Sequence, residues 1–371
     1  MSLAYPELRA SRCTRYRFRY SACSRCADVC PHDAVTLTDE GVGIDPARCH
    51  NCALCVTACP TDALASEALK PIDLLREAIR HERFTIACAP SGADGDVVVP
   101  CLGAVDAGSL AYLAKRRIPL TLRGSAHCVH CAHGVRGAAQ LASHLDACAL
   151  LQDVAASAEQ AADWIAPQLD EADIAKPDRP GAAPFAAGRR QWFRRLVGRG
   201  AAEVARSLEV PAPAPMTPDK AIRPGPYALP ERRELLQIVC TRKDDRPFRV
   251  PLHDALPMMA LSLQPGCTTC EACFRVCPTG AIQIEESPAD YQLKFDADRC
   301  VGCGVCLEVC QPRVLDADVD FDARPEQAPR VLLVMTKQRC ARCDRHFVSP
   351  TPQQSCPICR DDEDAFTAIF G

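Results

Sequence analysis

A chain of 371 residues is too long for one small core, and its length predicts two to four domains. Its 26 cysteines would indicate disulfides in a short secreted protein, but in a long chain with regular spacings they indicate metal ligands and a reducing compartment, the cytoplasm. A net charge of −4 disfavours nucleic acid as the main partner, and with no export signal and no apolar run of about 18 residues we expect no membrane span.

Two cysteine runs occur in residues 1–68, the first predicted module. The complete run has the pattern Cys-x2-Cys-x2-Cys-x3-Cys-Pro and comprises Cys49, Cys52, Cys55, Cys59 and Pro60. The run before it lacks the leading cysteine and comprises Cys23, Cys26, Cys30 and Pro31. In such runs three thiolates surround one iron-sulfur cube and the fourth reaches the neighbouring cube, whereas zinc sites use paired knuckles. The predicted [4Fe-4S] ligands are therefore Cys30, Cys49, Cys52 and Cys55.

The second cluster of this module has three evident ligands, Cys23, Cys26 and Cys59, because Tyr20 stands where a leading cysteine is expected. Cys13 lies ten residues before Cys23 and has no other nearby partner, so we predict that it is the fourth ligand. The alternatives are a three-iron cluster, or a cluster with an open iron that binds a small molecule.

The segment 9–20, before these runs, is rich in arginine and aromatic residues. An RNA-binding arm has a similar composition, but no nucleic-acid-binding module follows. We therefore interpret the segment as a solvated edge that lies beside an anionic cluster.

Residues 69–151 change from cysteine loops to alternating helix and strand patterns. Apolar spacing predicts helices over 72–80, 106–116 and 134–150, and strands over 84–88, 97–101 and 120–123. Strands that alternate with helices imply a parallel sheet, in which functional groups gather where strands end. Cysteines stand at such ends at four positions, Cys88, Cys101, Cys128 and Cys131.

These four cysteines could hold a [2Fe-2S] cluster or a zinc ion, or be buried thiols. The segment 100–106, with Cys88 and the loop 91–94 before it, is similar to the delta subunit of methyl-viologen-reducing hydrogenase. The resemblance implies a [2Fe-2S] cluster. It departs from that family in lacking a second cysteine after the first strand and in the close spacing of Cys128 and Cys131, which keeps zinc open.

Other candidate ligands in this region are assigned supporting or buried roles. His127, His130 and His133 flank the last two cysteines, and we interpret them as surface or supporting imidazoles. Cys148 and Cys240 stand alone and are predicted to be buried thiols.

Residues 152–262 shift to alanine, proline and charge, which predicts a connector that is helical over 156–169 and then extended or disordered. Within it, 189–197 places Trp192 and Leu196 on one stripe of a basic amphipathic helix. We expect this helix to dock to a partner or to the rest of the chain, with peripheral membrane contact as the alternative.

Residues 263–330 contain two complete runs and predict a second dicluster module. By the same crossed ligation, one [4Fe-4S] cluster is expected on Cys267, Cys270, Cys273 and Cys310. The other is expected on Cys277, Cys300, Cys303 and Cys306. This segment resembles the bacterial two-cluster ferredoxin module, except that Gln311 separates Cys310 from Pro312, which we expect to weaken the turn. Hairpins are predicted between the runs, over 34–38 and 43–45 and over 281–285 and 291–295.

The tail, 331–371, carries two more cysteine pairs, Cys340 with Cys343 and Cys356 with Cys359. Two knuckles at this separation predict a structural zinc ribbon, with rubredoxin-type iron as the alternative. The whole chain is thus predicted to be an α+β protein with two ferredoxin-like dicluster modules, a small α/β domain between them and a zinc ribbon.

The cysteine pattern predicts a polyferredoxin that relays single electrons between a cytoplasmic donor and a redox enzyme, as a non-catalytic subunit. The hydrogenase-like segment indicates a complex of the formate dehydrogenase, hydrogenase or heterodisulfide reductase type. Two alternatives stay open: an accessory or maturation factor for a metalloenzyme, and an iron-sulfur enzyme with an open-iron site. No glycine-rich dinucleotide fingerprint or P-loop is present to support the second alternative.

Overall fold

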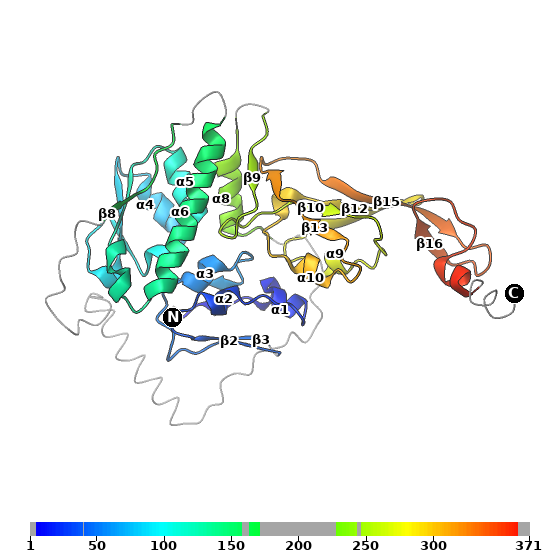
Figure 1. The fold of residues 1–371 in the computed structure, drawn as a ribbon, viewed down its shortest axis with the longest axis horizontal. Helices are drawn as coiled ribbons and strands as arrows, with labels where there is room; N and C mark the ends of the chain where they lie inside the picture. The colour runs from blue at the N-terminus through cyan, green and yellow to red at the C-terminus, as the bar shows by residue number, and fades with distance from the viewer. Residues whose placement is uncertain (1–4, 40, 158–162, 171–227, 243–245, 363–371) are drawn as a thin grey trace, which may run out of the picture.

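The computed structural model describes residues 5–39, 41–157, 163–170, 228–242 and 246–362. Figure 1 shows a parallel sheet with its helices at one end, the C-terminal cysteine site at the other, and the two cysteine-rich modules between them. The predicted basic helix over 189–197 lies outside the described residues. Within the described ranges, no helix is both long enough and apolar enough to cross a lipid bilayer.

The first module consists of short elements around its cysteine loops. Its helical turns are η1 (Ala10–Arg12), α1 (Thr14–Arg17), α2 (Arg25–Asp28) and α3 (Leu54–Ala58). Its strands are β1 (Glu7–Leu8), β2 (Val35–Thr38), β3 (Gly41–Ile44) and β4 (Leu64–Ala65). The predicted hairpin is confirmed as β2 and β3, which pair antiparallel, while β1 pairs with β4 and closes the ends of the module.

The α/β domain has a four-stranded parallel sheet in the order β6-β5-β7-β8, as the alternating pattern predicted. The strands are β5 (Phe84–Cys88), β6 (Val97–Val99), β7 (Leu120–Arg123) and β8 (Gln168–Asp170). Its helices and helical turns are α4 (Pro71–Ala78), η2 (Ala89–Ser91), η3 (Leu102–Ala104), α5 (Ala107–Lys115), η4 (Ser125–His130) and α6 (Gly134–Ala156). Asp106 caps α5 by accepting a hydrogen bond from the amide of Ser109 at 3.0 Å.

The predicted connector differs from the structure in three places. Strand β8 lies where helix was predicted, because it pairs in parallel with β7 and completes the sheet. Helix α8 (Glu231–Cys240) packs between the α/β domain and the second module, and β9 (Arg249–Pro251) pairs with a strand of that module. Alternation of short polar and apolar stretches hid these elements, since their burial comes from tertiary contacts rather than from a long periodic pattern.

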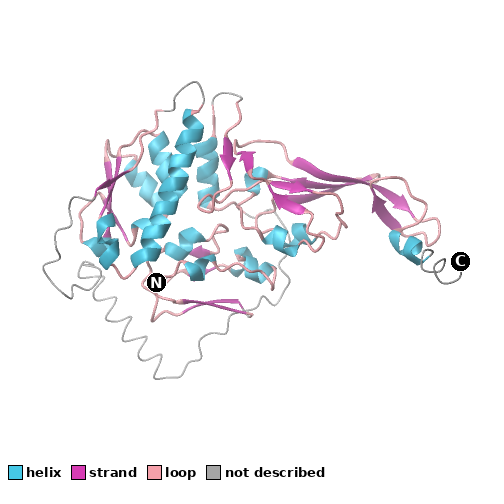
Figure 2. Cartoon of the chain, viewed as in Figure 1, coloured by secondary structure: helices cyan, strands magenta, loops and turns pink. Residues whose placement is uncertain are grey.

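The second module repeats the plan of the first and continues directly into the tail. Its helical turns are α9 (Ala272–Val276), η5 (Ala297–Arg299) and α10 (Val305–Val309). Its strands are β10 (Leu261–Leu263), β11 (Ile282–Glu286), β12 (Asp290–Phe295), β13 (Leu315–Ala317) and β14 (Asp320–Asp322). The tail strands β15 (Arg330–Arg339) and β16 (His346–Ser349) extend the predicted hairpin into one sheet, β11-β12-β15-β16. Figure 2 shows how the long strand β15 links the module to the C-terminal site.

One hydrophobic core runs from the α/β domain through α8 into the second module. It includes Leu110 of α5, Leu236 of α8, Phe248 and Phe295, each at most 2% exposed. The first module has its own smaller clusters, so it relies on polar contacts for its position. The α/β domain and the second module therefore form a single cooperative body.

Helix α8 attaches both modules through two adjacent buried arginines. Arg232 donates to Asp62 and to the carbonyls of Val56, Thr57 and Cys59 in the first module. Arg233 donates to the carbonyls of Cys300 and Ala297 in the second module, both at 2.9 Å. Neighbouring residues on a helix point about 100° apart, so one turn can reach two different modules.

Replacing Arg233 by alanine should destabilise the holo-protein by about 3 kcal/mol, because two buried carbonyls lose a charged donor. Scanning calorimetry of the full chain, purified without oxygen, measures the effect as a lower midpoint. The exposed neighbour Glu234 is the control, and E234A should change stability by less than about 0.5 kcal/mol. Equal midpoints for R233A and E234A would contradict the role given to this helix.

Candidate iron-sulfur and metal centres

The three complete cysteine runs share one backbone conformation. In each run the residues on both sides of the middle cysteine are left-handed, with φ between 51° and 77°. These residues are Asn51 and Ala53, Thr269 and Glu271, and Gly302 and Gly304. A left-handed conformation costs a non-glycine residue about 1–2 kcal/mol, so the surroundings must hold these turns in place. Such a bend wraps the chain around its own cysteines, as a cluster-binding loop requires.

The incomplete run lacks this conformation, and a distant cysteine completes its set. Ser24, which follows Cys23, has a φ of −125°. Burial raises the pKa of Cys13 to about 11, and the charges of nearby Cys59 and Cys23 act in the same direction. Burial likewise raises the pKa of Cys26 to about 12, followed by the charges of Cys59, Cys23 and Cys13. The structure thus brings together all four thiols predicted for this centre.

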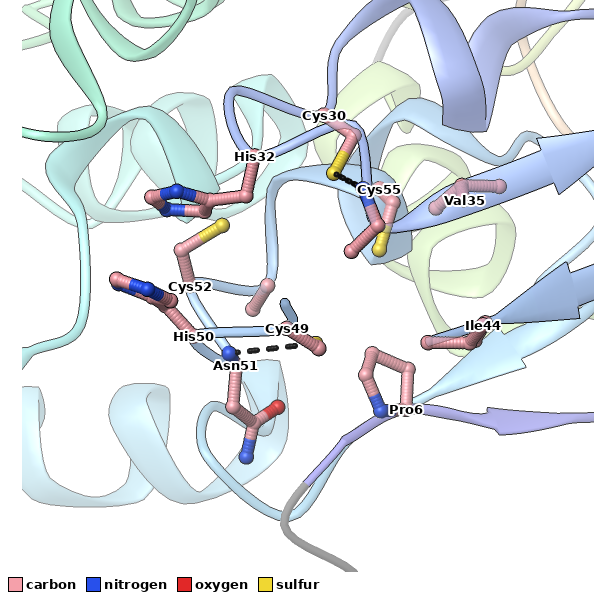
Figure 3. Close-up of a pocket in the computed structure, with 12 residues that line it drawn as sticks. Pro6, Cys30, His32, Val35, Ile44, Cys49, His50, Asn51, Cys52 and Cys55 are labelled. Carbon is pink, nitrogen blue, oxygen red and sulfur yellow. Dashed lines mark hydrogen bonds between the residues drawn. The ribbon is translucent and has the colours of Figure 1, made fainter. Parts of the chain in front are cut away.

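The other set of the first module surrounds a small cavity (Figure 3). Its four cysteines are Cys30, Cys49, Cys52 and Cys55, and the remaining wall includes the apolar side chains of Pro6, Val35 and Ile44. The amide of Ala34 donates to Cys30 Sγ at 3.3 Å, and that of Asn51 donates to Cys49 Sγ at 3.4 Å. Four thiols, an apolar wall and amide donors to sulfur fit a [4Fe-4S] cluster, whose potential such donors tune.

The second module also brings together both predicted sets. Burial raises the pKa of Cys273 to about 12, with the charges of Cys267, Cys270 and Cys310 adding to the shift. Burial raises the pKa of Cys306 strongly, and its next causes are the charges of Cys303, Cys300 and Cys277. The sets differ in access: Cys270 is exposed, whereas Cys277, Cys300 and Cys306 are buried.

The turn after the last cysteine is the same in all four runs. The third residue after each last cysteine is left-handed, namely Asp33, Asp62, Gly280 and Arg313. The amide of Arg313 donates to the carbonyl of Cys310 at 3.0 Å, whereas the equivalent bonds to Cys30 and Cys59 measure 3.4 and 3.3 Å. The expected weakening of the turn after Cys310 is therefore wrong, because the displaced proline leaves the hydrogen bond intact.

The four cysteines of the α/β domain meet at the carboxyl end of its sheet. Cys88 ends β5, Cys101 follows β6, and Cys128 and Cys131 lie in and after η4, which follows β7. Burial raises the pKa of Cys88 to about 11, and the charges of Cys131 and Cys128 contribute. Burial also raises the pKa of Cys101, with contributions from Cys88, Cys52 and Cys128. These thiols do not gather within 4.8 Å of one another, as the ligands of a single ion do elsewhere in the described chain.

The cysteine sets lie in a fixed order, because one pair of thiols links each set to the next. Besides burial, the pKa of Cys306 is raised by Cys273, and that of Cys303 by Cys23 of the other module. The pKa of Cys55 is raised by burial and then by thiols that include Cys26. Cys52 contributes to the shift of Cys101 and packs in one apolar cluster with it.

The arginine-rich segment lies at the junction of the two modules, as a supporting role predicts. Arg17 donates to the carbonyl of Cys277 in the second module at 3.1 Å. Arg15 donates to the carbonyl of Ser21 at 2.9 Å, in the loop before Cys23. Nearby, the amide of Ala22 donates to Glu308 at 3.3 Å. The guanidinium charges therefore lie beside the cysteine loops rather than on a free surface.

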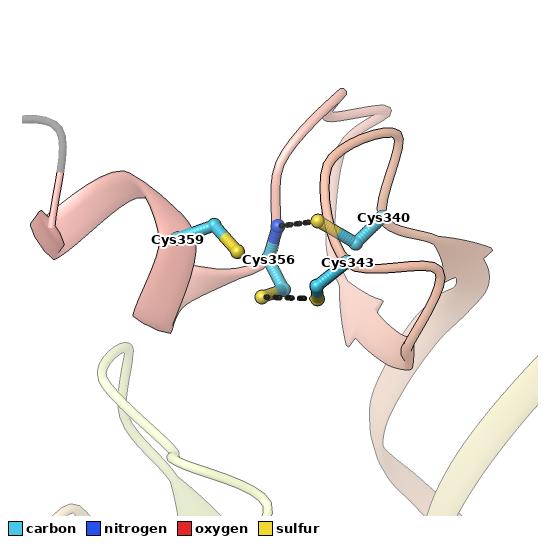
Figure 4. Close-up of side chains that lie close together, drawn as sticks. All are labelled: Cys340, Cys343, Cys356 and Cys359. Atoms are coloured by element: carbon cyan, nitrogen blue, oxygen red, sulfur yellow. Dashed lines mark hydrogen bonds between the residues drawn. The ribbon is translucent and has the colours of Figure 1, made fainter.

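The C-terminal cysteines form a compact four-thiol site (Figure 4). The sulfur atoms of Cys340, Cys343, Cys356 and Cys359 all lie within 4.8 Å of one another. The amide of Cys356 donates to Cys340 Sγ at 3.3 Å and, with the amide of Cys343, lowers the pKa of Cys340 to about 6. A side-chain hydrogen bond with Cys343, together with burial, raises the pKa of Cys359 to about 12. This geometry suits one tetrahedral metal ion.

Sequence reasoning missed two histidines that the structure places beside the first module's cavity. His32 and His50 stack with ring centroids 3.8 Å apart, and His133 lies edge-on to both. Burial lowers the pKa of His133 to about 4, with the two other rings contributing. Their positions directly after cluster cysteines were a signal, but 18 residues separate His32 from His50 in the sequence. The isolated thiols Cys148 and Cys240 are buried in the core, as predicted.

Comparison with known proteins identifies the cysteine-rich modules. The 4Fe-4S dicluster domain matches residues 21–63 and 266–314. An uncharacterized ferredoxin of Methanocaldococcus jannaschii is 40% identical over 53 residues, which are 13% of this chain and 69% of that protein. This chain belongs to the ferredoxins with 4Fe-4S dicluster domains.

Other relatives of this ferredoxin match over shorter shares of their length. A polyferredoxin protein of Methanothermobacter marburgensis is 40% identical over 52 residues, 12% of this chain and 13% of its own length. Formate hydrogenlyase subunit 2 of Escherichia coli is 39% identical over 49 residues, 13% of this chain and 24% of its own length. No solved structure matches this ferredoxin. It is an iron-sulfur electron-transfer protein, and several relatives are subunits of oxidoreductase complexes.

Substitution of Cys13 by alanine should convert one [4Fe-4S] centre to a three-iron centre, because the other three thiols stay in place. Electron paramagnetic resonance of the air-free oxidised protein should show one new three-iron signal per chain. The buried, non-ligating Cys148 is the matched control, and C148A should show none. A stoichiometric three-iron signal already present in the unsubstituted protein would mean that Cys13 is not a ligand.

Zinc added to the metal-stripped C-terminal site near neutral pH should release about three protons, because Cys340 is already a thiolate while ordinary cysteines are thiols. Below the pKa of Cys340, about 6, the release should rise toward four protons. Calorimetry in buffers of different ionisation enthalpy counts the protons. C340S should bind more weakly and show no rise, and a pH-independent count in the unsubstituted protein would refute the assignment.

Proposed function

We propose that the protein is an electron relay with five redox centres in a row. The single observation that carries this proposal is the order of the cysteine sets, in which each set approaches the next through one pair of thiols. The row starts at the set of Cys270, passes Cys303, crosses to Cys23, continues to Cys52 and ends at Cys101. Since electron tunnelling falls steeply with distance, an unbroken row of neighbouring centres is what transfer across the molecule needs.

The ligands of the four [4Fe-4S] centres follow the crossed pattern of the sequence. We assign one centre to Cys267, Cys270, Cys273 and Cys310, and the next to Cys277, Cys300, Cys303 and Cys306. The centres of the first module are assigned to Cys13, Cys23, Cys26 and Cys59, and to Cys30, Cys49, Cys52 and Cys55. Such clusters exchange single electrons, while the protein supplies thiolates, amide donors to sulfur and exclusion of water.

The set of Cys88, Cys101, Cys128 and Cys131 is assigned to a [2Fe-2S] centre rather than to zinc. A single zinc ion would draw its four thiols together, as at the C-terminal site, but three or more ligand atoms do not meet within 4.8 Å here. Two irons bridged by sulfide span a longer distance and suit the wider spread. The compact set of Cys340, Cys343, Cys356 and Cys359 is assigned to a structural zinc ion, as part of a ribbon built on β15 and β16.

The two ends of the row are the places for redox partners. At one end Cys270 is exposed beside a cleft of about 740 Å³, whose wall includes Glu271, Tyr291 and Arg339. At the other end the loop of Cys128 and Cys131 carries Val129, which is 82% exposed. We propose that a cytoplasmic donor and a catalytic oxidoreductase subunit dock at these ends, in a complex related to those of the relatives named above.

The alternative of an iron-sulfur enzyme with an open iron has less support. It needs a three-thiol set, but Cys13 joins Cys23, Cys26 and Cys59. The alternative of a maturation factor depended on the basic helix over 189–197 as a client contact, and that helix lies outside the described residues. The relay therefore remains the function that the described geometry supports best.

The relay order can be tested by magnetic coupling between reduced centres. C303A removes a centre inside the proposed row, so the set of Cys270 should lose its neighbour and give a narrow, slowly relaxing resonance. C270A removes the terminal centre instead, and the other centres should stay coupled. C148A should leave the dithionite-reduced spectrum unchanged. If C303A and C270A disturb the same remaining signals, the centres do not lie in the proposed order.

A further inference from the structure

Three imidazoles from separate segments meet between the first module and the α/β domain. His32 follows the Cys30–Pro31 turn, His50 follows Cys49, and His133 precedes helix α6. One ring nitrogen from each of the three lies within 4.8 Å of the other two. Figure 3 shows His32 and His50 one above the other beside Cys52, at the edge of the cavity. The cluster is separate from the thiols already assigned to iron and zinc.

Two of these rings carry buried nitrogen atoms without a partner. His133 is 6% exposed, and its Nδ1 has no hydrogen-bond partner among the described residues. The Nε2 atom of His32 is buried and also lacks a partner there. A buried polar atom without a partner costs about 1–3 kcal/mol, so a ligand that accepts both lone pairs would remove a real penalty.

The charges around the cluster are compatible with a cation. The sulfur sets of Cys52 and Cys131 lie on either side, and both become anionic when they hold iron. The nearby Arg136 is paired with Asp33 at 3.3 Å and donates to the carbonyl of Cys30, so its charge is compensated. Arg48 also pairs with Asp33, at 3.6 Å. The local field therefore favours a positive ion over an anion.

We propose that His32, His50 and His133 together bind one divalent transition-metal ion, zinc in the first instance, whose fourth position is open to water. Imidazole is a preferred ligand for zinc, and three imidazoles with one open position form a known type of tetrahedral site. Zinc–nitrogen bonds of about 2.0–2.1 Å would draw the three rings slightly closer than they now lie.

Such an ion would tie the first module to the α/β domain across the step between two redox centres. Its positive charge would stabilise added electrons on either side, so the adjacent centres should be easier to reduce when the ion is bound. This site does not depend on the relay being correct, because its ligands and its occupancy can be measured without electron transfer.

The test uses the full chain, purified without oxygen and dialysed against zinc. H133A and H50A should each lower the zinc content by one equivalent per chain with iron unchanged, because each removes one of three ligands. His130 flanks Cys131 but lies outside the cluster, so H130A is the matched control and should keep the full zinc content. Zinc-edge X-ray absorption of the unsubstituted protein should show nitrogen as well as sulfur neighbours.

Two results would overturn the proposal. One is zinc content in H133A and H50A equal to that in H130A. The other is a zinc-edge spectrum with sulfur neighbours alone, and this measurement decides the matter even if a substitution also reduces the iron content, because it needs no variant. Loss of the relay order in the coupling experiment would leave both results unaffected, so the two hypotheses fail separately.

Discussion

The arrangement of this protein depends on two adjacent arginines that point to different modules. Arg232 and Arg233 are 5% and 2% exposed, and their hydrogen bonds end on backbone carbonyls within the cysteine loops. A guanidinium group keeps its charge when buried, and its planar fork can serve several carbonyls at once. Because helix α8 also packs on α5 through Leu235 and Leu236, the α/β domain, the first module and the second module are held by one helical turn.

The cysteine loops are strained, and this strain explains why they depend on the groups they hold. Ala53 and Glu271 are left-handed, although each is cheaper in an ordinary conformation. Burial also opposes ionisation of the thiols, as the raised pKa values of Cys26 and Cys300 show. Metal binding reverses both costs, since it requires thiolates and fixes the turn. Cluster insertion and folding of these modules are therefore expected to be coupled.

The sequence predicted what is local and missed what is tertiary. Spacing predicted the cysteine turns, and strand patterns at 84–88 and 120–123 matched β5 and β7 residue for residue. It did not predict α8 as the joint, because Arg232 and Arg233 look like ordinary surface residues until the carbonyls of two distant modules surround them. Likewise, His32 and His50 belong to different loops, and only the fold stacks their rings. Crossed ligation can be read within a module, but the approach of Cys23 to Cys303 depends on how modules dock.

Exposure along the row then determines where electrons can enter and leave. The inner step between Cys23 and Cys303 lies at the module junction, where Arg17 donates to the carbonyl of Cys277. A partner protein cannot approach that step closely, whereas Cys270 is exposed and the loop of Cys128 is half-exposed. Nearby arginine charge makes a buried anionic centre easier to reduce, while solvent at an exposed centre supplies its own stabilisation. The fold thus shields the middle of the row, compensates its charge, and leaves the ends to the partners.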